Sequence, residues 1–464
     1  MYRLAIDVGT TNIKLSLFEK YQLIDKIEIR IETQYKEFGK VFQNPAEILQ
    51  HIKSGIKKFG EKGIEIEQIS FSTAMHSIMP VIDTLYDEEM FIWLDTQASS
   101  FVKEFKKEEL ANRFYQKTGT PIHEMSPFSK MAFMKNKIWF KEVKKWIGLK
   151  EYLMSAFTGQ EVIDYSTASA TGLFNIHEKK WDEEILDFLE IEKEKLAELV
   201  DTDAYYVIKK ELADELFISQ DILVYIGACD GCLASYASYL GNGTMNTLTI
   251  GTSGAVRKLT KKIELDKEGK TFCYYLNKEY WVVGGASNNG GQVLEWASDV
   301  FCQNQSIYEE LDQIFKLSPI GSNGVLFLPY IAGERAPLWN AKATGGFKKI
   351  SIHNKREDLL RSLSEGILFN LRYISELINL DTREISVSGG FFDSPILATL
   401  AADIFGKNCI QSVFSEPSFG LICLIEPPKK SIILDQKRIF TSLENHLKYK
   451  NIYNMFVEEL KTEL

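Results

Sequence analysis

Two short stretches far apart in the chain have the residue types that bind phosphate. The first contains Gly9-Thr-Thr-Asn12, and the second contains Gly251-Thr-Ser-Gly254. Glycine lets backbone N–H groups converge on an anion, and hydroxyl side chains add further donors. One such stretch alone is most often an ordinary hairpin turn. Because the pattern occurs twice, it favours a duplicated domain that holds a nucleotide between its two halves.

A carboxylate lies in front of the first of these turns. Asp7 ends an apolar strand directly before Gly9. In this position it could hold a water-coordinated Mg²⁺ against phosphate groups. An aspartate at a strand end can also simply make turn hydrogen bonds. The second phosphate-type stretch in the same chain favours the metal role.

A second aspartate is the candidate for proton chemistry. Asp230 lies in Gly227-Ala-Cys-Asp-Gly231, between the apolar strand 222–226 and a helix of small residues. Small neighbours leave space for a ligand, and α/β proteins place their sites at the C-terminal ends of strands. A carboxylate there can accept the proton of a substrate hydroxyl during phosphoryl transfer. The alternative role for Asp230 is that of a helix N-cap.

Four further positions are weaker candidates. Gly290-Gly291 and Gly389-Gly390 each precede a helix, so a flat ring or a phosphate could approach the backbone, although close helix–sheet packing gives the same pattern. His76 and Asp95 each close an apolar strand and could contact a polyol, with a core or capping role as the alternative. Neither GxxxxGK[ST] nor GxGxxG occurs, which argues against a P-loop kinase and a Rossmann dehydrogenase.

The flanking segments predict the elements that position these residues. Apolar residues alternate with period two around both glycine turns, over residues 4–17 and 245–257, which predicts two hairpins. Asn44-Pro45 predicts the start of a helix, and further helices are expected over about 356–378 and in the tail. We expect the tail helix to carry on its apolar face Leu443, Leu447, Phe456 and Leu460. Strands separated by helices indicate α/β domains with mixed sheets.

Composition excludes several classes of protein. The 464 residues include 54 basic and 64 acidic side chains, and no basic patch interleaved with aromatics suggests nucleic acid. No apolar run approaches the ~18 residues needed to span a bilayer. The first strand begins close to Met1, which leaves no room for a signal peptide. The six cysteines form no disulfide or zinc pattern, so we expect a cytoplasmic protein.

Taken together, the motifs resemble those of the FGGY carbohydrate kinases, in order and spacing, over roughly residues 1–420. The resemblance is carried by Asp7-Val-Gly-Thr-Thr-Asn12, Ala74-Met-His-Ser77, Trp93-Leu-Asp95, Gly227-Ala-Cys-Asp-Gly231, Ile250-Gly-Thr-Ser253 and Ser388-Gly-Gly390. Four other stretches resemble the gluconokinase branch of that family: Thr118-Gly-Thr-Pro-Ile-His123, Asp164-Tyr-Ser-Thr-Ala-Ser-Ala-Thr-Gly172, Asn288-Asn-Gly-Gly291 and Gly333-Glu-Arg-Ala-Pro-Leu-Trp-Asn340.

The resemblance implies two actin-like ATPase (ribonuclease H-like) domains with a cleft between them. Residues 1–240 would form a carbohydrate-binding domain with a helical insertion at about 100–200, and residues 241–464 a nucleotide-binding domain. Asp230 would be the catalytic base and, with Asp7, would hold the metal. The phosphates would be met by Thr10, Thr11, Asn12, Lys14, Gly251 and Thr252. The nucleoside would be bordered by Gly291, Gly390 and Ser394. The substrate would lie near Met75, His76, Asp95 and Asp230.

The implied reaction is phosphorylation of D-gluconate to 6-phosphogluconate with ATP and Mg²⁺. Within the class, the alternative is a pentulose kinase such as a xylulokinase. From another class, it is a non-catalytic nucleotide-dependent sensor, because fold does not fix function. The expected partners are a sugar acid or polyol and ATP, with no nucleic acid or membrane, and a homodimer is possible. No obvious cation is available for the substrate carboxylate, and Lys130 is the candidate. Gln97 stands where the family often has arginine.

Overall fold

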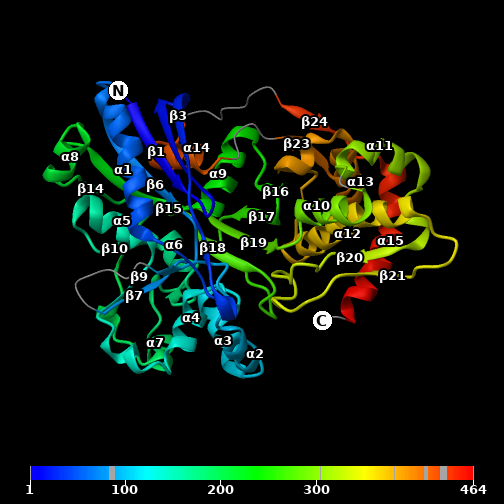
Figure 1. Cartoon of the computed structure of the whole chain (residues 1–464), viewed down its shortest axis with the longest axis horizontal. Coiled ribbons are helices and arrows are strands. Elements are labelled where there is room, and N and C mark those ends of the chain that lie inside the picture. Colours follow the sequence, from blue (N-terminus) through cyan, green and yellow to red (C-terminus); the bar gives the residue numbers. More distant parts are fainter. Residues whose placement is uncertain are drawn as a thin grey trace. The chain divides into compact units, whose positions relative to one another are not determined.

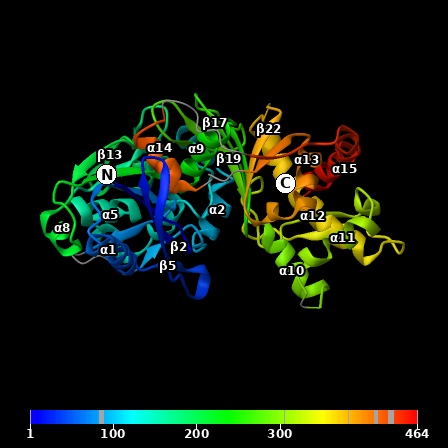
Figure 2. The same ribbon diagram turned by 90° about the horizontal axis from the view of Figure 1, so that it is seen from above.

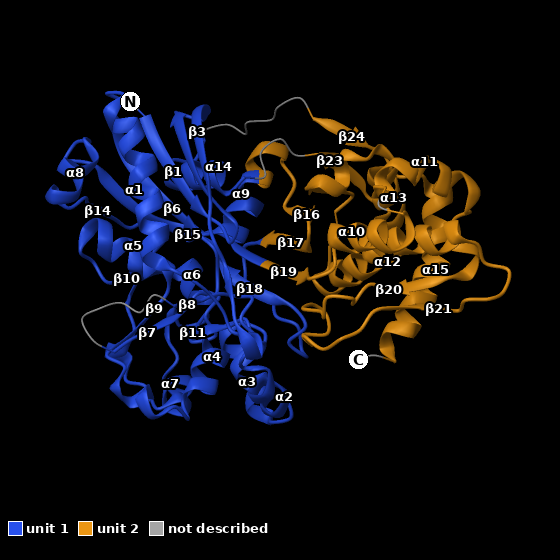
Figure 3. Ribbon diagram, in the orientation of Figure 1, with its two compact units in different colours: residues 1–237, 260–282, 414–430 blue, residues 238–259, 283–413, 431–464 orange. Residues whose placement is uncertain are grey.

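The computed structural model describes residues 2–82, 89–303, 305–380, 382–411, 416–428 and 436–462. The chain forms two compact units (Figure 3). The first unit comprises residues 1–237, 260–282 and 414–430, and the second comprises residues 238–259, 283–413 and 431–464. Each unit is therefore built from separate parts of the sequence.

The first unit is organised around a six-stranded mixed sheet. Its strand order is β14-β15-β6-β1-β2-β3. The central strands β15, β6 and β1 run parallel to one another, whereas β2, β3 and β14 pair antiparallel with their neighbours. The strands are β14 (Tyr205–Val207), β15 (Leu223–Cys229), β6 (Ile66–Thr73), β1 (Tyr2–Val8), β2 (Asn12–Glu19) and β3 (Gln22–Arg30).

Helices cover both faces of this sheet (Figures 1 and 2). On β2, Leu15 packs against Gly55 of α1, and the next residue, Ser16, donates its hydroxyl hydrogen to the Ser418 hydroxyl of α14. Successive strand residues point to opposite faces, so α1 and α14 lie on opposite sides of the sheet. This double cover explains why Leu4, Ala5 and Ile6 in succession are fully buried. The helices around this sheet are α1 (Pro45–Glu61), α5 (Leu149–Thr158), α6 (Tyr165–Ser169), α8 (Lys210–Leu216), α14 (Pro417–Ile425) and α9 (Asp230–Asn242), whose last residues, 238–242, belong to the second unit.

Short elements complete the first unit. Its remaining helices are α2 (Ser99–Phe105), α3 (Glu109–Thr118), α4 (Pro127–Met134) and α7 (Glu183–Leu189). Small sheets pair β4 (Gln34–Tyr35), β5 (Val41–Gln43) and β8 (Met90–Phe91), then β7 (Met79–Val81) with β9 (Lys145–Ile147), β10 (Val162–Asp164) with β13 (Glu198–Val200), and β11 (Phe174–Asn175) with β12 (Lys180–Trp181). Strand β18 (Phe272–Tyr275) packs against α6.

The second unit repeats the same plan. Its strand order is β19-β17-β16-β22-β23-β24, which from β19 to β23 matches the order β3-β2-β1-β6-β15 of the first unit. The duplication predicted from the two glycine turns is confirmed at the level of topology. The strands are β16 (Asn246–Ile250), β17 (Gly254–Thr260), β19 (Trp281–Ser287), β22 (Glu384–Ser388), β23 (Asn408–Gln411) and β24 (Lys437–Ile439), with the separate pair β20 (Leu326–Leu328) and β21 (Gly346–Lys348). The helices are α10 (Gly291–Phe301), α11 (Ile307–Leu317), α12 (Arg356–Leu377), α13 (Pro395–Phe405) and α15 (Leu443–Lys461).

The expectation for the tail helix was partly wrong. Phe456 and Leu460 of α15 are buried, but Leu443 is 72% exposed and Leu447 is 54% exposed. The buried face continues upstream through Tyr449 and Tyr453 instead. Large aromatic side chains therefore fill the positions spaced by three and four residues, and the two leucines lie outside that stripe. Within the described ranges, none of the helices is long and apolar enough to cross a membrane.

Candidate active site

The first group of predicted residues meets at one edge of the first sheet. Val8 of β1 and Cys229 of β15 both lie level with Thr73 of β6. These three strands are parallel, so the residues that follow them emerge at the same edge. They are the turn 9–11, the segment 74–76 and Asp230. The carboxyl edge of parallel strands is the usual place for a ligand in an α/β protein.

Asp7 is a buried carboxylate near this edge. It is 6% exposed, and the Ser72 hydroxyl donates a hydrogen bond of 2.7 Å to its Oδ1. Burial raises the pKa of Asp7 to about 7, and the negative charge of Asp230 adds to the rise, whereas Lys14 opposes it. Two carboxylates close enough to repel each other favour a cation between or beside them.

Asp230 starts helix α9 directly after β15. The Gly231 N–H donates a hydrogen bond of 2.7 Å to its Oδ1, which fixes the side chain at the helix N-terminus. The partial positive charge of a helix N-terminus favours the ionised carboxylate. This contact reaches the next residue, whereas the side chain of a helix N-cap accepts the N–H two or three residues further on. Asp230 is half-buried at the ligand edge of the sheet.

The tip of the first hairpin is held by neighbouring polar side chains. The Trp93 indole N–H donates a 2.8 Å hydrogen bond to the Thr10 hydroxyl, and Gln43 Nε2 donates one of 2.7 Å to the Thr10 carbonyl. Thr11, the next residue, is exposed. The tip therefore has a fixed backbone and an accessible hydroxyl, as a phosphate-binding turn needs.

Asn12 and Lys14, which were also expected to contact the phosphates, both have polar partners in the structure. Asn12 Nδ2 donates a 2.9 Å hydrogen bond to Glu28. Lys14 pairs with Asp7 in the β1–β2 register, and its ammonium lies 3.5 Å from Glu416. Lys14 therefore lies beside the Asp7 carboxylate, whereas the Asn12 side chain is engaged with β3.

His76 is fixed in an unusual backbone conformation. Its φ of 71° lies in the left-handed region, and its ring Nδ1 is 2.7 Å from the Ala170 carbonyl oxygen. The ring packs edge-on against Tyr274, and only 7% of the residue is exposed. Left-handed backbone at a non-glycine residue marks a constrained position, typical of ligand sites. The preceding Met75 is half-buried.

Asp95 is buried between backbone donors and a lysine. It is 1% exposed, and it accepts hydrogen bonds from the N–H groups of Val41 at 2.9 Å and Gln97 at 3.3 Å. Burial raises the pKa of Asp95, and the charge of Lys130 works against that rise. Lys130 is itself 1% exposed, and its ammonium donates to the backbone carbonyls of residues 124 and 125.

The second unit gathers the residues expected around the nucleoside. Strands β16 and β22 are parallel, with Thr249 level with Ser388, so the turns after both strands lie together. Gly389 has φ 99°, and a Cβ there would lie 2.3 Å from the Ile250 carbonyl oxygen. Gly291 N donates a 2.6 Å hydrogen bond to the Gly251 carbonyl. These glycines are required because the three loops approach each other at backbone distance.

Gly251 and Gly390 border open space on the side where a side chain would lie. A Cβ on Gly251 would meet no atom within 4 Å, and one on Gly390 would meet only Asp393, at 3.9 Å. Thr252 is exposed, and its carbonyl accepts the N–H groups of residues 290 and 292. Ser394 caps helix α13 by accepting the Leu397 N–H. The structure thus brings Gly251, Thr252, Gly291 and Gly390 together.

Glu334 organises the loop that leads to Gly291. This carboxylate is fully buried, and burial raises its pKa to about 7. It accepts hydrogen bonds from the Ser287 hydroxyl (2.6 Å), the Asn288 N–H (2.8 Å), the Asn289 amide (3.2 Å) and the Asn370 amide of α12 (3.1 Å). One side chain therefore ties residues 287–289 to helix α12.

The comparison with known proteins decides the family. Residues 2–236 match the N-terminal domain model of the FGGY family of carbohydrate kinases, and residues 246–418 match its C-terminal domain model. The chain belongs to the FGGY family of carbohydrate kinases. The family resemblance and the α/β fold class expected from the sequence are therefore confirmed, and the chain is a carbohydrate kinase.

Three individual proteins are similar over nearly their whole length. The gluconokinase of Bacillus subtilis (strain 168) is 35% identical over 448 residues, covering 91% of this chain and 86% of its own. Two solved structures from Lactobacillus acidophilus, one of a gluconate kinase and one of a ligand-bound xylulose kinase, each superpose with a TM-score of 0.94 at 29% identity. Each match covers 99% of this chain and 98% of the other.

The donor set of this FGGY kinase fits a magnesium ion bound together with phosphates. Among the described residues, no group of three or more His, Cys, Asp or Glu side chains could hold a metal alone. Mg²⁺ differs from metals that need such a cage, because it keeps several waters and uses one or two carboxylates plus substrate phosphates. Burial, together with the charge of Asp230, raises the pKa of Asp7, and a cation beside the two carboxylates would favour their ionised forms.

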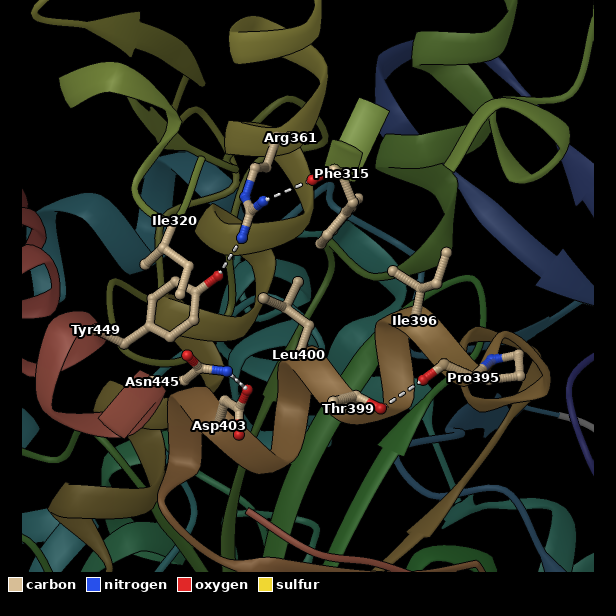
Figure 4. A pocket seen from close by; sticks show the side chains of 10 residues that line it. All are labelled: Phe315, Ile320, Arg361, Pro395, Ile396, Thr399, Leu400, Asp403, Asn445 and Tyr449. Carbon is tan, nitrogen blue, oxygen red and sulfur yellow. Dashed lines mark hydrogen bonds between the residues drawn. The ribbon is translucent and has the colours of Figure 1, made fainter. Parts of the chain in front are cut away.

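A separate cavity in the second unit offers less chemistry. It measures about 380 Å³ and is lined from α11, α12, α13 and α15 (Figure 4). Polar side chains that line it already have hydrogen-bond partners: Arg361 donates to Glu365 and Tyr449, and Asp403 accepts from Asn445. None of the residues expected to bind substrate or nucleotide lines it. This cavity therefore does not contain the residues that the sequence predicted for the site.

Several residues that shape the site were missed from the sequence. Ser72, Gln43 and Glu334 hold the Asp7 carboxylate, the Thr10 turn and the 287–289 loop. Glu334 lies in a stretch that was recognised only as a family resemblance. Ser72 and Gln43 carry no signal of their own, because their roles arise from strand pairing between distant segments.

Proposed function

We propose that this FGGY kinase phosphorylates D-gluconate to 6-phosphogluconate, with ATP as phosphoryl donor and Mg²⁺ as cofactor. The observation that carries the proposal is the pair of carboxylates at the edge of the first sheet. Asp230 starts a helix after β15, and burial together with the charge of Asp230 raises the pKa of Asp7. The choice of gluconate rests on the likeness to a gluconokinase over most of the chain.

In the proposed mechanism, Asp230 is the general base. Its carboxylate accepts the proton of the C6 hydroxyl while that oxygen forms a bond to the γ-phosphorus and the bond from phosphorus to the ADP oxygen breaks. The Gly231 N–H holds the carboxylate in one orientation. The partial positive charge at the N-terminus of α9 is a favourable environment for this carboxylate.

The two glycine turns would bind the phosphate chain. In the first unit, the turn carries the hydroxyls of Thr10 and Thr11, and in the second unit the corresponding turn carries Gly251 and Thr252. Asp7 and Asp230 would hold Mg²⁺ through water. When bound, this ion would neutralise charge on the phosphates. Lys14, beside Asp7, adds a positive charge to the same side.

The sugar acid would lie along the edge that carries His76 and Asp95, beside Met75. A buried carboxylate such as Asp95 can accept hydrogen bonds from substrate hydroxyls. Lys130 is enclosed in α4 and donates to backbone carbonyls. We therefore assign Lys130 to neutralising Asp95, and not to binding the carboxylate of the substrate.

A pentulose kinase is the second candidate, because one of the two equally similar solved structures is a xylulose kinase. The test is a panel of sugars with purified protein and Mg-ATP, in which ADP release is followed by a coupled assay. We expect the highest kcat/KM with D-gluconate and little activity with D-xylulose. A preference for xylulose would show that the enzyme is a pentulose kinase. ATP binding without any sugar-dependent turnover would support a sensor instead.

The proposal extends to the compartment, the partners and the oligomeric state of the enzyme. We propose a cytoplasmic enzyme whose partners are a small sugar acid and ATP, with no role for nucleic acid. A homodimer is part of the proposal, and light scattering of the purified protein at micromolar concentration tests it. A single species of about 53 kDa, the mass of one chain, would contradict the dimer.

A further inference from the structure

A buried ion pair lies directly behind the catalytic edge of the first unit. Lys150 of α5 and Asp164 at the end of β10 both have fully buried side chains, with Nζ 3.4 Å from Oδ2. Burying two charges is costly unless further hydrogen bonds satisfy them. The contacts of this pair therefore indicate what it does for the fold.

Lys150 donates to the backbone of the two strands that lead to the site. Its ammonium lies 2.9 Å from the Phe71 carbonyl of β6, and 2.6 Å and 3.3 Å from the Ile226 and Ala228 carbonyls of β15. Burial lowers the pKa of Lys150, and Asp164 opposes that change. Three carbonyls and a carboxylate around one nitrogen need all three N–H donors, so the ammonium form is the one that fits.

The carbonyls held by Lys150 belong to a β-bulge. Tyr225 pairs with Ser70, but Ala228 pairs with Ser72, so β15 contains one extra residue between the two pairs. Gly227 takes φ 69° there, and a Cβ on it would lie 2.2 Å from the Phe71 carbonyl oxygen. One extra residue inverts the side-chain alternation of everything that follows. The bulge thus sets the direction in which β15 delivers Asp230.

Asp164, the acidic member of the pair, links it to helix α6 and from there to His76. Its two carboxylate oxygens accept the N–H and the hydroxyl of Thr167, each at 2.8 Å, which caps helix α6. Within α6, the Ser166 hydroxyl accepts the Cys229 N–H at 3.3 Å, one residue before Asp230. The residue after α6, Ala170, supplies the carbonyl that holds His76.

We propose that the Lys150–Asp164 pair is a positioning element of the active site: it fixes the bulge that directs Asp230, and through α6 it fixes His76. The inference rests on the proposed roles of Asp230 as base and of His76 in substrate binding. Both residues of the pair act through the backbone, without touching substrate. Displacing the base by about 1 Å can cost a hundredfold in rate.

The test replaces both charges at once, as Lys150→Met with Asp164→Asn. Asparagine can still cap α6, and removing both partners avoids the uncompensated charge that a single replacement would leave. We expect a folded protein whose Kd for ATP stays within a few-fold of wild type, because the nucleoside-bordering glycines belong to the second unit and the Thr10–Thr11 turn is held by Trp93 and Gln43. We expect kcat to fall about 100-fold. A folded double variant with kcat within threefold of wild type would overturn the inference.

A milder variant and a matched control complete the experiment. Ser166→Ala removes only the contact to Cys229 and should lower kcat severalfold with the same Kd for ATP; unchanged kcat there would also count against the inference. Ile52→Ala creates a cavity in the core of the same unit, on α1, at a cost of about 2–5 kcal/mol. We expect its kcat to stay within threefold of wild type. An equal loss in this control would assign the effect to stability alone.

The wild type is assayed first, with the sugar panel. If it turns over a sugar other than gluconate, the proposed substrate is wrong, and the variants are compared on the sugar that reacts. The positioning inference is then judged by the same kcat ratios.

Discussion

At the scale of single residues, Asp7 shows how a functional site opposes stability. The carboxylate is buried, and its neighbourhood includes a second carboxylate. Its pKa of about 7 lies well above the ordinary value of 3.8. The folded protein therefore holds a proton that the unfolded chain releases between about pH 4 and 7, and stability must fall as pH rises through this range. In the proposed mechanism, a bound Mg²⁺ would favour the ionised carboxylate and so remove this penalty.

Replacing Asp7 by asparagine should therefore stabilise the metal-free protein at pH 8. The whole pKa difference corresponds to at most about 4 kcal/mol, at 1.36 kcal/mol per unit. Asparagine keeps an oxygen for the Ser72 hydroxyl and never ionises. Thermal unfolding in EDTA should show Asp7→Asn melting above wild type at pH 8, with the gap closing towards pH 4. A gap of the same size at every pH would contradict the account. The exposed Glu37→Gln is the control and should show no gap.

At the scale of elements, the site depends on loops whose approach requires glycine and whose shape requires buried polar side chains. In the second unit, Gly389 and Gly291 lie against the carbonyls of β16 and its turn. The loop before Gly291 is held from behind by Glu334. Because this loop ends at the start of α10, its position decides where the N–H groups of that helix point.

Glu334→Gln should raise the KM for ATP about tenfold and leave the KM for gluconate unchanged. The amide would point a donor at groups that are themselves donors, and each buried hydrogen bond left unmade costs about 1–3 kcal/mol. Steady-state kinetics with each substrate varied separately provides the measurement.

The matched control for Glu334→Gln is Glu365→Gln. Glu365 is a carboxylate of α12 that is equally buried and is bonded to Arg361, Tyr449 and Ser322. The Glu365→Gln variant should be less stable than the wild type, without a change in its KM for ATP. Equal effects of the two substitutions on that KM would argue that Glu334 is only structural.

At the scale of the whole molecule, the chain is a duplication whose two halves bring different chemistry. Both units carry a glycine–threonine turn between the two strands that open the sheet, at residues 9–11 and 251–253. The first unit adds Asp7, Asp230 and the polar edge around His76, and the second adds the glycine turns after β19 and β22. The proposed reaction needs both sets, since the phosphate donor and the hydroxyl acceptor must meet.

The sequence predicted the parts of this architecture that local rules control. Alternation located both hairpins, and Asn44-Pro45 located the start of α1, where the Asn44 side chain caps the helix. The strand expected over 222–226 ended three residues too early, because β15 continues to Cys229 and the bulge at Gly227 cannot be recognised from alternation. Nothing in the local sequence distinguishes Lys150 from the nearby Lys144 and Lys145. Only the fold shows that its ammonium is enclosed by carbonyls from two distant strands.

The most direct test of the central claim is the Asp230→Asn variant, assayed with Mg-ATP and D-gluconate beside the wild type. Asparagine cannot accept the hydroxyl proton, and general-base catalysis contributes about 10²–10⁴-fold, so we expect kcat to fall by at least a hundredfold. Calorimetry should give a Kd for ATP within a few-fold of wild type, and the melting temperature should be little changed. A variant that keeps its kcat, or that loses ATP binding and folding to the same degree as activity, would contradict the assignment of Asp230 as the base.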